Sequence, residues 1–124
     1  MATLTATLKL VADAGGPFSD AISVSLTKAY TTNEGNKMHK LKLTGAAQQI
    51  QVAASTGNVV LVFKNLSATH PVYVHNTTDN TGAGTRIANI GTGEIALIPS
   101  DGAADIHVTG TSAQYLEYMS FAKA

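Results

Sequence analysis

Apolar and polar residues alternate strictly along the first dozen positions of the chain. Over residues 3–12, threonines and a lysine fall on one face, and the other face holds Leu4, Ala6, Leu8 and Leu10. Because successive side chains of an extended strand point to opposite faces, this pattern predicts a half-buried strand. The Gly-Gly-Pro sequence within residues 13–17 predicts the turn that ends it, since Gly permits positive φ and Pro cannot donate to a ladder.

The same period recurs over the rest of the first half. Residues 19–30 alternate again, with Ile22, Val24 and Leu26 on the predicted inner face, and residues 31–36 are polar enough to predict a loop. His39, Leu41 and Leu43 then share one face. Residues 46–49 are compatible with one helical turn, and residues 49–53 predict a short strand around Ile50 and Val52.

The second half contains one segment of a different kind. Residues 59–63 read Val-Val-Leu-Val-Phe, a continuous apolar run that is typical of a central strand buried on both faces. Shorter strands are predicted around it, at residues 71–76, 86–90, 94–98, 105–109 and 114–122. Residues 91–93, Gly-Thr-Gly, predict a tight hairpin, residues 99–102 a turn, and residues 77–85 an exposed loop.

About nine or ten short strands with turn signals every 8–12 residues predict an all-β fold. We expect an antiparallel β-sandwich or a jelly-roll-like barrel. No segment has a convincing helical period, and no linker-like break divides the chain, so residues 1–124 are interpreted as a single domain.

Composition excludes several classes of function. Only 13% of the residues are charged and the formal net charge is zero, whereas a nucleic-acid binder needs a net basic face. No apolar stretch approaches the roughly 18–20 residues of a membrane span, and the N-terminus does not resemble a secretory signal. Neither nucleic acid nor membrane is therefore an expected partner. A neutral surface with few charges is poorly protected against association, which favours a surface that a partner covers.

The chain offers no constellation of residues for catalysis, cofactor binding or metal binding. There is no cysteine, no serine-nucleophile elbow and no phosphate-binding glycine loop, and the carboxylates are scattered, several of them in predicted turns. Of the four histidines, His75 and His107 lie on predicted strands, where facing one another remains open. A zinc site would need three or four convergent ligands. We therefore expect no enzymatic activity, no cofactor and no metal.

The second half of the chain resembles a family of small β-sandwich proteins from tailed-phage virions. The resemblance covers residues 58–121 and lies in the order of its strands: Gly-Glu-Ile-Ala-Leu-Ile-Pro at 93–99, Asp-Ile-His-Val at 105–108 and Leu-Glu-Tyr at 116–118. It implies a non-enzymatic virion component, assembled in the host cytoplasm. Proteins of this family decorate or cement the capsid, often as trimers, or build parts of the tail.

The favoured hypothesis is a capsid decoration protein that forms a homotrimer and binds the major capsid protein or a neighbouring virion protein. Residues 1–12 are interpreted as an N-terminal arm that pairs with a neighbour, with Leu4, Ala6, Leu8 and Leu10 as the assembly interface. Deleting residues 2–12 should then weaken assembly without unfolding the core. Two alternatives remain: a tail, fibre or head–tail structural protein, and a carbohydrate or host-surface binding module, which would need an aromatic cluster or a calcium loop.

Overall fold

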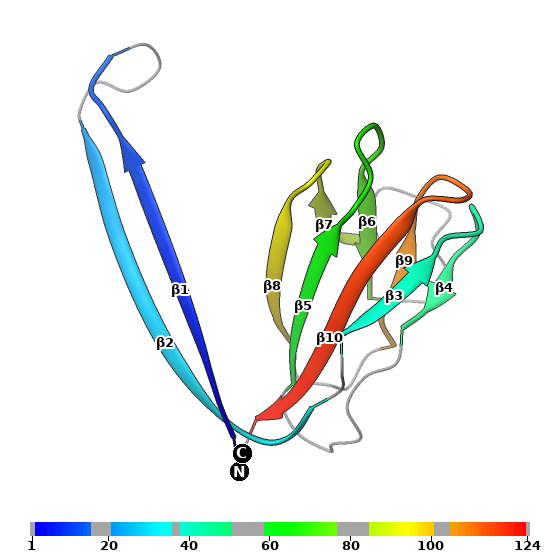
Figure 1. Cartoon of the computed structure of the whole chain (residues 1–124), viewed down its shortest axis with the longest axis horizontal. Helices are drawn as coiled ribbons and strands as arrows, with labels where there is room; N and C mark the ends of the chain where they lie inside the picture. Colours follow the sequence, from blue (N-terminus) through cyan, green and yellow to red (C-terminus); the bar gives the residue numbers. More distant parts are fainter. Residues whose placement is uncertain are drawn as a thin grey trace.

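A computed structural model describes residues 2–15, 21–35, 38–50, 59–76, 85–100 and 105–123. Over these residues the chain forms ten strands in two antiparallel sheets, which confirms the predicted all-β sandwich (Figure 1). The strands are β1 (Ala2–Ala12), β2 (Ile22–Gly35), β3 (His39–Lys42), β4 (Gln48–Gln49), β5 (Val59–Asn65), β6 (Val72–His75), β7 (Arg86–Ile90), β8 (Ile95–Ser100), β9 (His107–Thr109) and β10 (Tyr115–Lys123).

The first sheet has the order β1-β2-β10-β5-β8, with β3 also paired to β10. β10 is its central strand: β5 pairs along one side of it, and the other side takes β3 near its beginning and β2 near its end. Since β2 meets β10 only through Gly35, Glu34 and Thr32, the remainder of β2 leaves the sheet with β1 as a hairpin. Figure 1 shows this hairpin splayed away from the other strands, and we call it the arm.

The second sheet, of order β4-β9-β6-β7, covers the inner face of β3, β5, β8 and β10. Val59, Leu61 and Phe63 of β5 point into this layer and are at most 1% exposed. The prediction that β5 is a central strand buried on both faces is confirmed for its first half, because the outward-facing Val60 is also fully buried. Val62 is half-buried and Lys64 is exposed, so the outer face of the strand becomes more exposed towards its end.

Three predictions of local structure are wrong because backbone pairing places these residues in strands. Residues 31–35 are not a loop but the end of β2, since this polar segment finds backbone partners in both β1 and β10. Gln48 and Gln49 form strand β4 against β9 rather than a helical turn. Pro99 and Ser100 belong to β8 and not to a turn, and Pro99 is tolerated because β8 is an edge strand.

The predicted hairpin at residues 91–93 is a tight turn, but it does not join paired strands. The Glu94 amide donates to the Gly91 carbonyl at 3.2 Å, the Glu94 carboxylate accepts from the Gly91 amide at 2.6 Å, and Gly93 has a φ of 72°. However, β7 before the turn belongs to the second sheet and β8 after it pairs with β5 in the first. The turn therefore carries the chain from one sheet to the other.

Some predictions fall wholly or partly on residues outside the described ranges. These are residues 16 and 17 of the turn at 13–17, the strand residues 51–53 with Val52, the loop at 77–85 except its last residue, Asp101 and Gly102, and the side chain of Ile22.

Candidate functional site

The arm is a regular two-stranded hairpin whose pairing runs without interruption from Ala2 opposite Thr32 to Ala12 opposite Ile22. The unbroken register places residues of like character on the same face, because directly opposed residues of an antiparallel pair point the same way. The apolar face joins Leu4 to Tyr30, Ala6 to Lys28, Leu8 to Leu26 and Leu10 to Val24. The opposite face is mostly threonine and serine, and on it the hydroxyls of Thr7 and Thr27 lie 3.3 Å apart.

The apolar face of the arm is largely exposed. Leu8 and Leu10 are 53% and 52% exposed, and their partners Leu26 and Val24 are 63% and 41% exposed. Leu4 and Ala6, which lie closer to the body of the molecule, are half-buried. The prediction that this face is an inner face buried in the core is therefore wrong at its outer end. The reason is that the second sheet lies behind β5 and β10 and does not reach the arm.

A groove separates the arm from the outer face of β5 and β8 in the same sheet. One wall is the apolar face of the arm, including Leu4, Ala6 and Leu26, and the other wall is Val62 of β5 with Ile95 and Leu97 of β8. The cavity volume is about 670 Å³. Since Ile95 is 69% exposed, the two walls do not cover one another. The groove thus adds a second apolar surface to the one on the arm.

All four residues predicted as an assembly interface lie together on the apolar face of the arm. Their four partners on β2 belong to the same surface, although the predicted interface was confined to β1. The alternation of these β2 residues and the Gly-Pro turn before them could have predicted the hairpin, because two alternating segments separated by a turn favour one. No sequence pattern indicated that Ile95 and Leu97 are exposed, since an exposed apolar side chain on an edge strand has the same pattern as a covered one.

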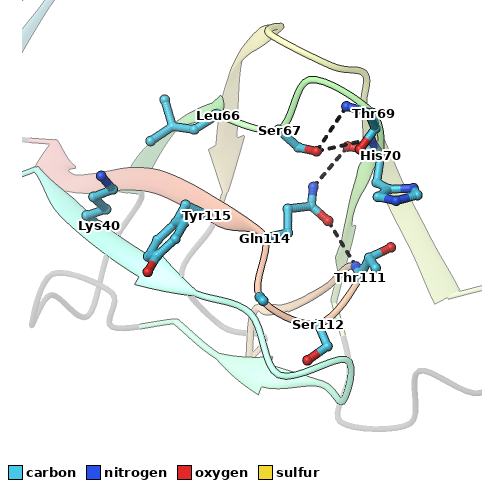
Figure 2. A pocket seen from close by; sticks show the side chains of 10 residues that line it. Lys40, Leu66, Ser67, Thr69, His70, Thr111, Ser112, Gln114 and Tyr115 are labelled. Atoms are coloured by element: carbon cyan, nitrogen blue, oxygen red, sulfur yellow. Dashed lines mark hydrogen bonds between the residues drawn. The ribbon is translucent and has the colours of Figure 1, made fainter.

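A second cavity, of about 460 Å³, lies where the β5–β6 connection meets the β9–β10 turn (Figure 2). Figure 2 shows Gln114 between the two segments, where its amide donates to the His70 carbonyl at 2.9 Å and its oxygen accepts from the Thr111 amide at 2.9 Å. The Ser67 hydroxyl accepts from the His70 amide at 3.0 Å. These polar groups already hold neighbouring loops in place, so the cavity is a structural junction.

The junction is centred on Asn65, which is 1% exposed. Its side-chain amide donates to the carbonyls of His70 at 2.9 Å, Ile90 at 3.1 Å and Gly91 at 3.0 Å. Its oxygen accepts from the Ser67 amide at 2.9 Å and from Gln114 at 3.2 Å. Asn65 therefore ties β5 to the start of β6 and to the turn that links the two sheets.

His75 and His107 are cross-strand partners on β6 and β9, which settles the question that the sequence left open. The ring of His75 lies between two hydroxyls, with Nδ1 2.9 Å from Thr85 Oγ1 and Nε2 2.8 Å from Thr109 Oγ1. Burial lowers the pKa of His75, and the charge of Arg86 and the neighbouring His107 lower it further. A neutral, fully hydrogen-bonded histidine of this kind contributes to packing.

The remaining titratable groups that the structure describes do not form a reactive cluster. No group of three or more His, Asp or Glu side chains converges in the described ranges to hold a metal ion. Glu94 caps its own turn, Asp105 lies 3.5 Å from the amide of Gln49, and Glu117 stands opposite lysines on both neighbouring strands. Asp20, Asp79 and Asp101 lie outside the described residues, as does the side chain of Glu34. Within the described part of the chain, no helix is long and apolar enough to cross a membrane.

The sequence matches no protein-family model and no curated protein. One solved structure is similar, from work describing Bacillus endospore appendages as a novel family of disulfide-linked pili. The similarity covers 73% of this chain and 88% of that one, with 15% sequence identity and a TM-score of 0.47.

Proposed function

We propose that this chain is a non-enzymatic structural subunit that assembles through its arm, and that it serves as a capsid decoration protein in the virion of a tailed phage. The observation that supports assembly most is the exposed apolar face of the arm, on which Leu8, Leu10 and Leu26 are each more than half exposed. A two-stranded hairpin is marginally stable by itself in water, so an arm of this length gains stability when a partner covers it.

A structural role also fits the chemistry of the described side chains. The polar groups of the second cavity hold loops together, and both ring nitrogens of His75 lie within hydrogen-bond distance of threonine hydroxyls. These hydrogen bonds leave few free polar groups in that cavity for substrate chemistry or for sugar binding. Because the 124 residues contain no cysteine, the contacts between subunits would be noncovalent.

The assignment to a phage virion is supported by the resemblance of residues 58–121 to virion β-sandwich proteins. Two of the quoted segments form strands next to the central β5: residues 93–99 contain most of β8, and residues 116–118 belong to β10. In this proposal the subunit forms a homo-oligomer and contacts the major capsid protein or a neighbouring virion protein.

The proposal is tested by making the apolar face of the arm polar. We expect the native protein to exceed its monomer mass of 12.8 kDa in light scattering, and the double variant Leu8→Ser/Leu26→Ser to run as a monomer. The two leucines are directly opposed on the arm and more than half exposed, so the folded monomer should tolerate the change. The matched control is Thr7→Ser/Thr27→Ser, one position along on the polar face, which should leave assembly intact.

Deletion of residues 2–12 is a poorer test, because it removes the strand that pairs with β2 along the whole arm. The virion assignment is tested separately, by co-sedimentation of the native protein with empty phage heads. Binding to heads supports a decoration protein. An assembling protein that ignores heads favours a tail component, and a protein that stays monomeric at every concentration contradicts the proposed role of the arm.

A further inference from the structure

The strand edges of this protein differ sharply in how well they are protected. An exposed edge presents unpaired backbone groups to other chains, and proteins usually shield such edges with charges, prolines, bulges or short strands. β8 has six residues and contains Pro99, β7 has five residues with Arg86 and a register shift beside it, β3 has four residues of which two are lysines, and β4 has two residues.

β1 has none of these protective features, and its free edge runs along the whole strand, whereas the free edge of β2 stops where β2 pairs with β10. It is eleven residues long, contains no proline, pairs with β2 without a register shift and carries a single charge, that of Lys9. In the part of the chain that the structure describes, β1 pairs with β2 on one side only, which leaves its other edge at the end of the sheet. At about 3.4 Å per residue, this edge is roughly 34 Å long.

We propose that this edge of β1 pairs in antiparallel fashion with β1 of a second copy, which joins two arms into one four-stranded sheet of order β2-β1-β1-β2. The inference rests on the proposed function, in which the arm is the assembly element, and it names the partner and the contact. The pairing is isologous, because the same strand serves on both sides of a two-fold axis. The zero formal net charge of the chain leaves little repulsion between the copies.

The sequence of β1 suits this pairing in one register. Full overlap of the strand with its copy places Thr7 at the two-fold axis, opposite Thr7 of the second copy, and every residue then opposes one on the same face. Leu10 meets Leu4 and Leu8 meets Ala6, so the apolar faces of the two arms become continuous. Lys9 meets Thr5, which keeps the only charged side chain of the strand away from its counterpart.

The partner is a second copy rather than another protein because this strand supplies both halves of the contact. A different partner would need its own unprotected strand of matching length and face pattern. The contact also places Leu8 and Leu10 of each copy beside apolar residues of the other and raises the arm from two strands to four. Three or more strands with a hydrophobic face are what an independently stable sheet requires.

The experiment uses single cysteines, which are unambiguous in a chain that has none of its own. Thr7→Cys and Thr27→Cys are closely matched, since the two threonines face each other on the exposed polar face with hydroxyls 3.3 Å apart. In the four-stranded sheet the copies of position 7 are neighbours, about 5 Å apart, whereas the copies of position 27 are separated by three strand spacings, about 14 Å. A disulfide requires a Cα separation of roughly 4.4–6.8 Å.

Under mild oxidation we expect Thr7→Cys to form a covalent dimer at least about tenfold faster than Thr27→Cys, because only the first pair lies within disulfide range. A mixture of Thr5→Cys and Lys9→Cys chains should likewise yield the mixed dimer, which fixes the register. Light scattering on the reduced proteins accompanies the assay. Oligomers that cross-link equally at positions 7 and 27 would overturn the edge pairing while leaving the arm as an assembly element. Reduced proteins that are monomeric would contradict the proposed function itself.

Discussion

The arm and the sandwich body are both built from antiparallel strands that carry apolar residues on one face, yet these faces end in opposite environments. In the body, Leu61 and Phe63 on β5 are fully buried between two sheets. In the arm, Leu8 and Leu26 occupy equivalent alternating positions and are more than half exposed. The difference does not lie in the strands, both of which have regular antiparallel partners. It lies in whether a second layer covers the apolar face.

The apolar face of an antiparallel strand contributes to stability only where a second layer buries it. In the body, the cover is intramolecular, and the side chains contribute to the folding stability of the monomer. In the arm, the same kind of side chain is exposed and contributes little to the stability of the monomer. Substitutions in the two regions should therefore affect different measurements.

The largest difference is expected between Leu61→Ala and Leu8→Ala, which are the same chemical change in the two regions. Removal of the fully buried Leu61 side chain leaves a cavity in the core and should lower the free energy of unfolding by about 2–5 kcal/mol. Leu8 is 53% exposed, and its truncation should cost less than about 1 kcal/mol in the dilute monomer. Urea unfolding of both variants measures this, and comparable losses would mean that the arm is part of the cooperative core.

A smaller but still large effect is expected at the polar junction of the body. Asn65→Ala removes the donor to three carbonyls and leaves buried backbone groups without partners, so the free energy of unfolding should fall by about 2–4 kcal/mol. Asn89→Ala is the control, because Asn89 is exposed on the edge strand β7 and its truncation should cost less than about 0.5 kcal/mol. Light scattering should find assembly through the arm unchanged in any Asn65→Ala protein that remains folded.

Acidification should lower the free energy of unfolding of the body, because the pKa of His75 is lowered in the folded state by burial, by Arg86 and by His107. The unfolded chain then binds a proton at a higher pH than the folded chain does. Stability is fully present above about pH 6.5, the ordinary pKa of histidine, and is lost as the pH falls from there towards the lowered pKa.

Urea unfolding at several pH values measures this loss. His75→Gln should flatten the dependence of stability on pH below about pH 6.5, whereas Asn89→Ala, at an exposed position and without a titratable group, should leave it as it is in the native protein. A native protein whose stability does not decline over this range would contradict the neutral, buried state of His75.

The smallest effect is expected on the polar face of the arm. Thr7→Ala removes only the contact between the Thr7 and Thr27 hydroxyls, a cross-strand pair worth roughly 0.2–1 kcal/mol. Urea unfolding of the monomer should register this small loss, and light scattering should find assembly preserved. If Thr7→Ala abolished assembly as Leu8→Ser/Leu26→Ser is expected to do, the distinction between the two faces of the arm would be lost.

The sequence by itself determined the kind of structure and the face of each residue. Alternation at Leu4, Ala6, Leu8 and Leu10 predicted both the strand and the common face of these residues, and the apolar run in β5 predicted its central place. Such inferences succeed because the two-residue period of a strand is local and needs no knowledge of distant segments. The same alternation predicted a half-buried strand at residues 3–12, however, and did not predict that Leu8 and Leu10 are exposed, because a covered and an uncovered face have the same pattern.

Only the tertiary structure decided which segments meet. It placed β7 and β8 in different sheets on either side of one tight turn, extended β2 through a polar segment, and brought His75 opposite His107. It also left the arm outside the cover of the second sheet. Each of these depends on pairing and packing between residues far apart in the chain, where the free energy comes from contacts that no local pattern encodes.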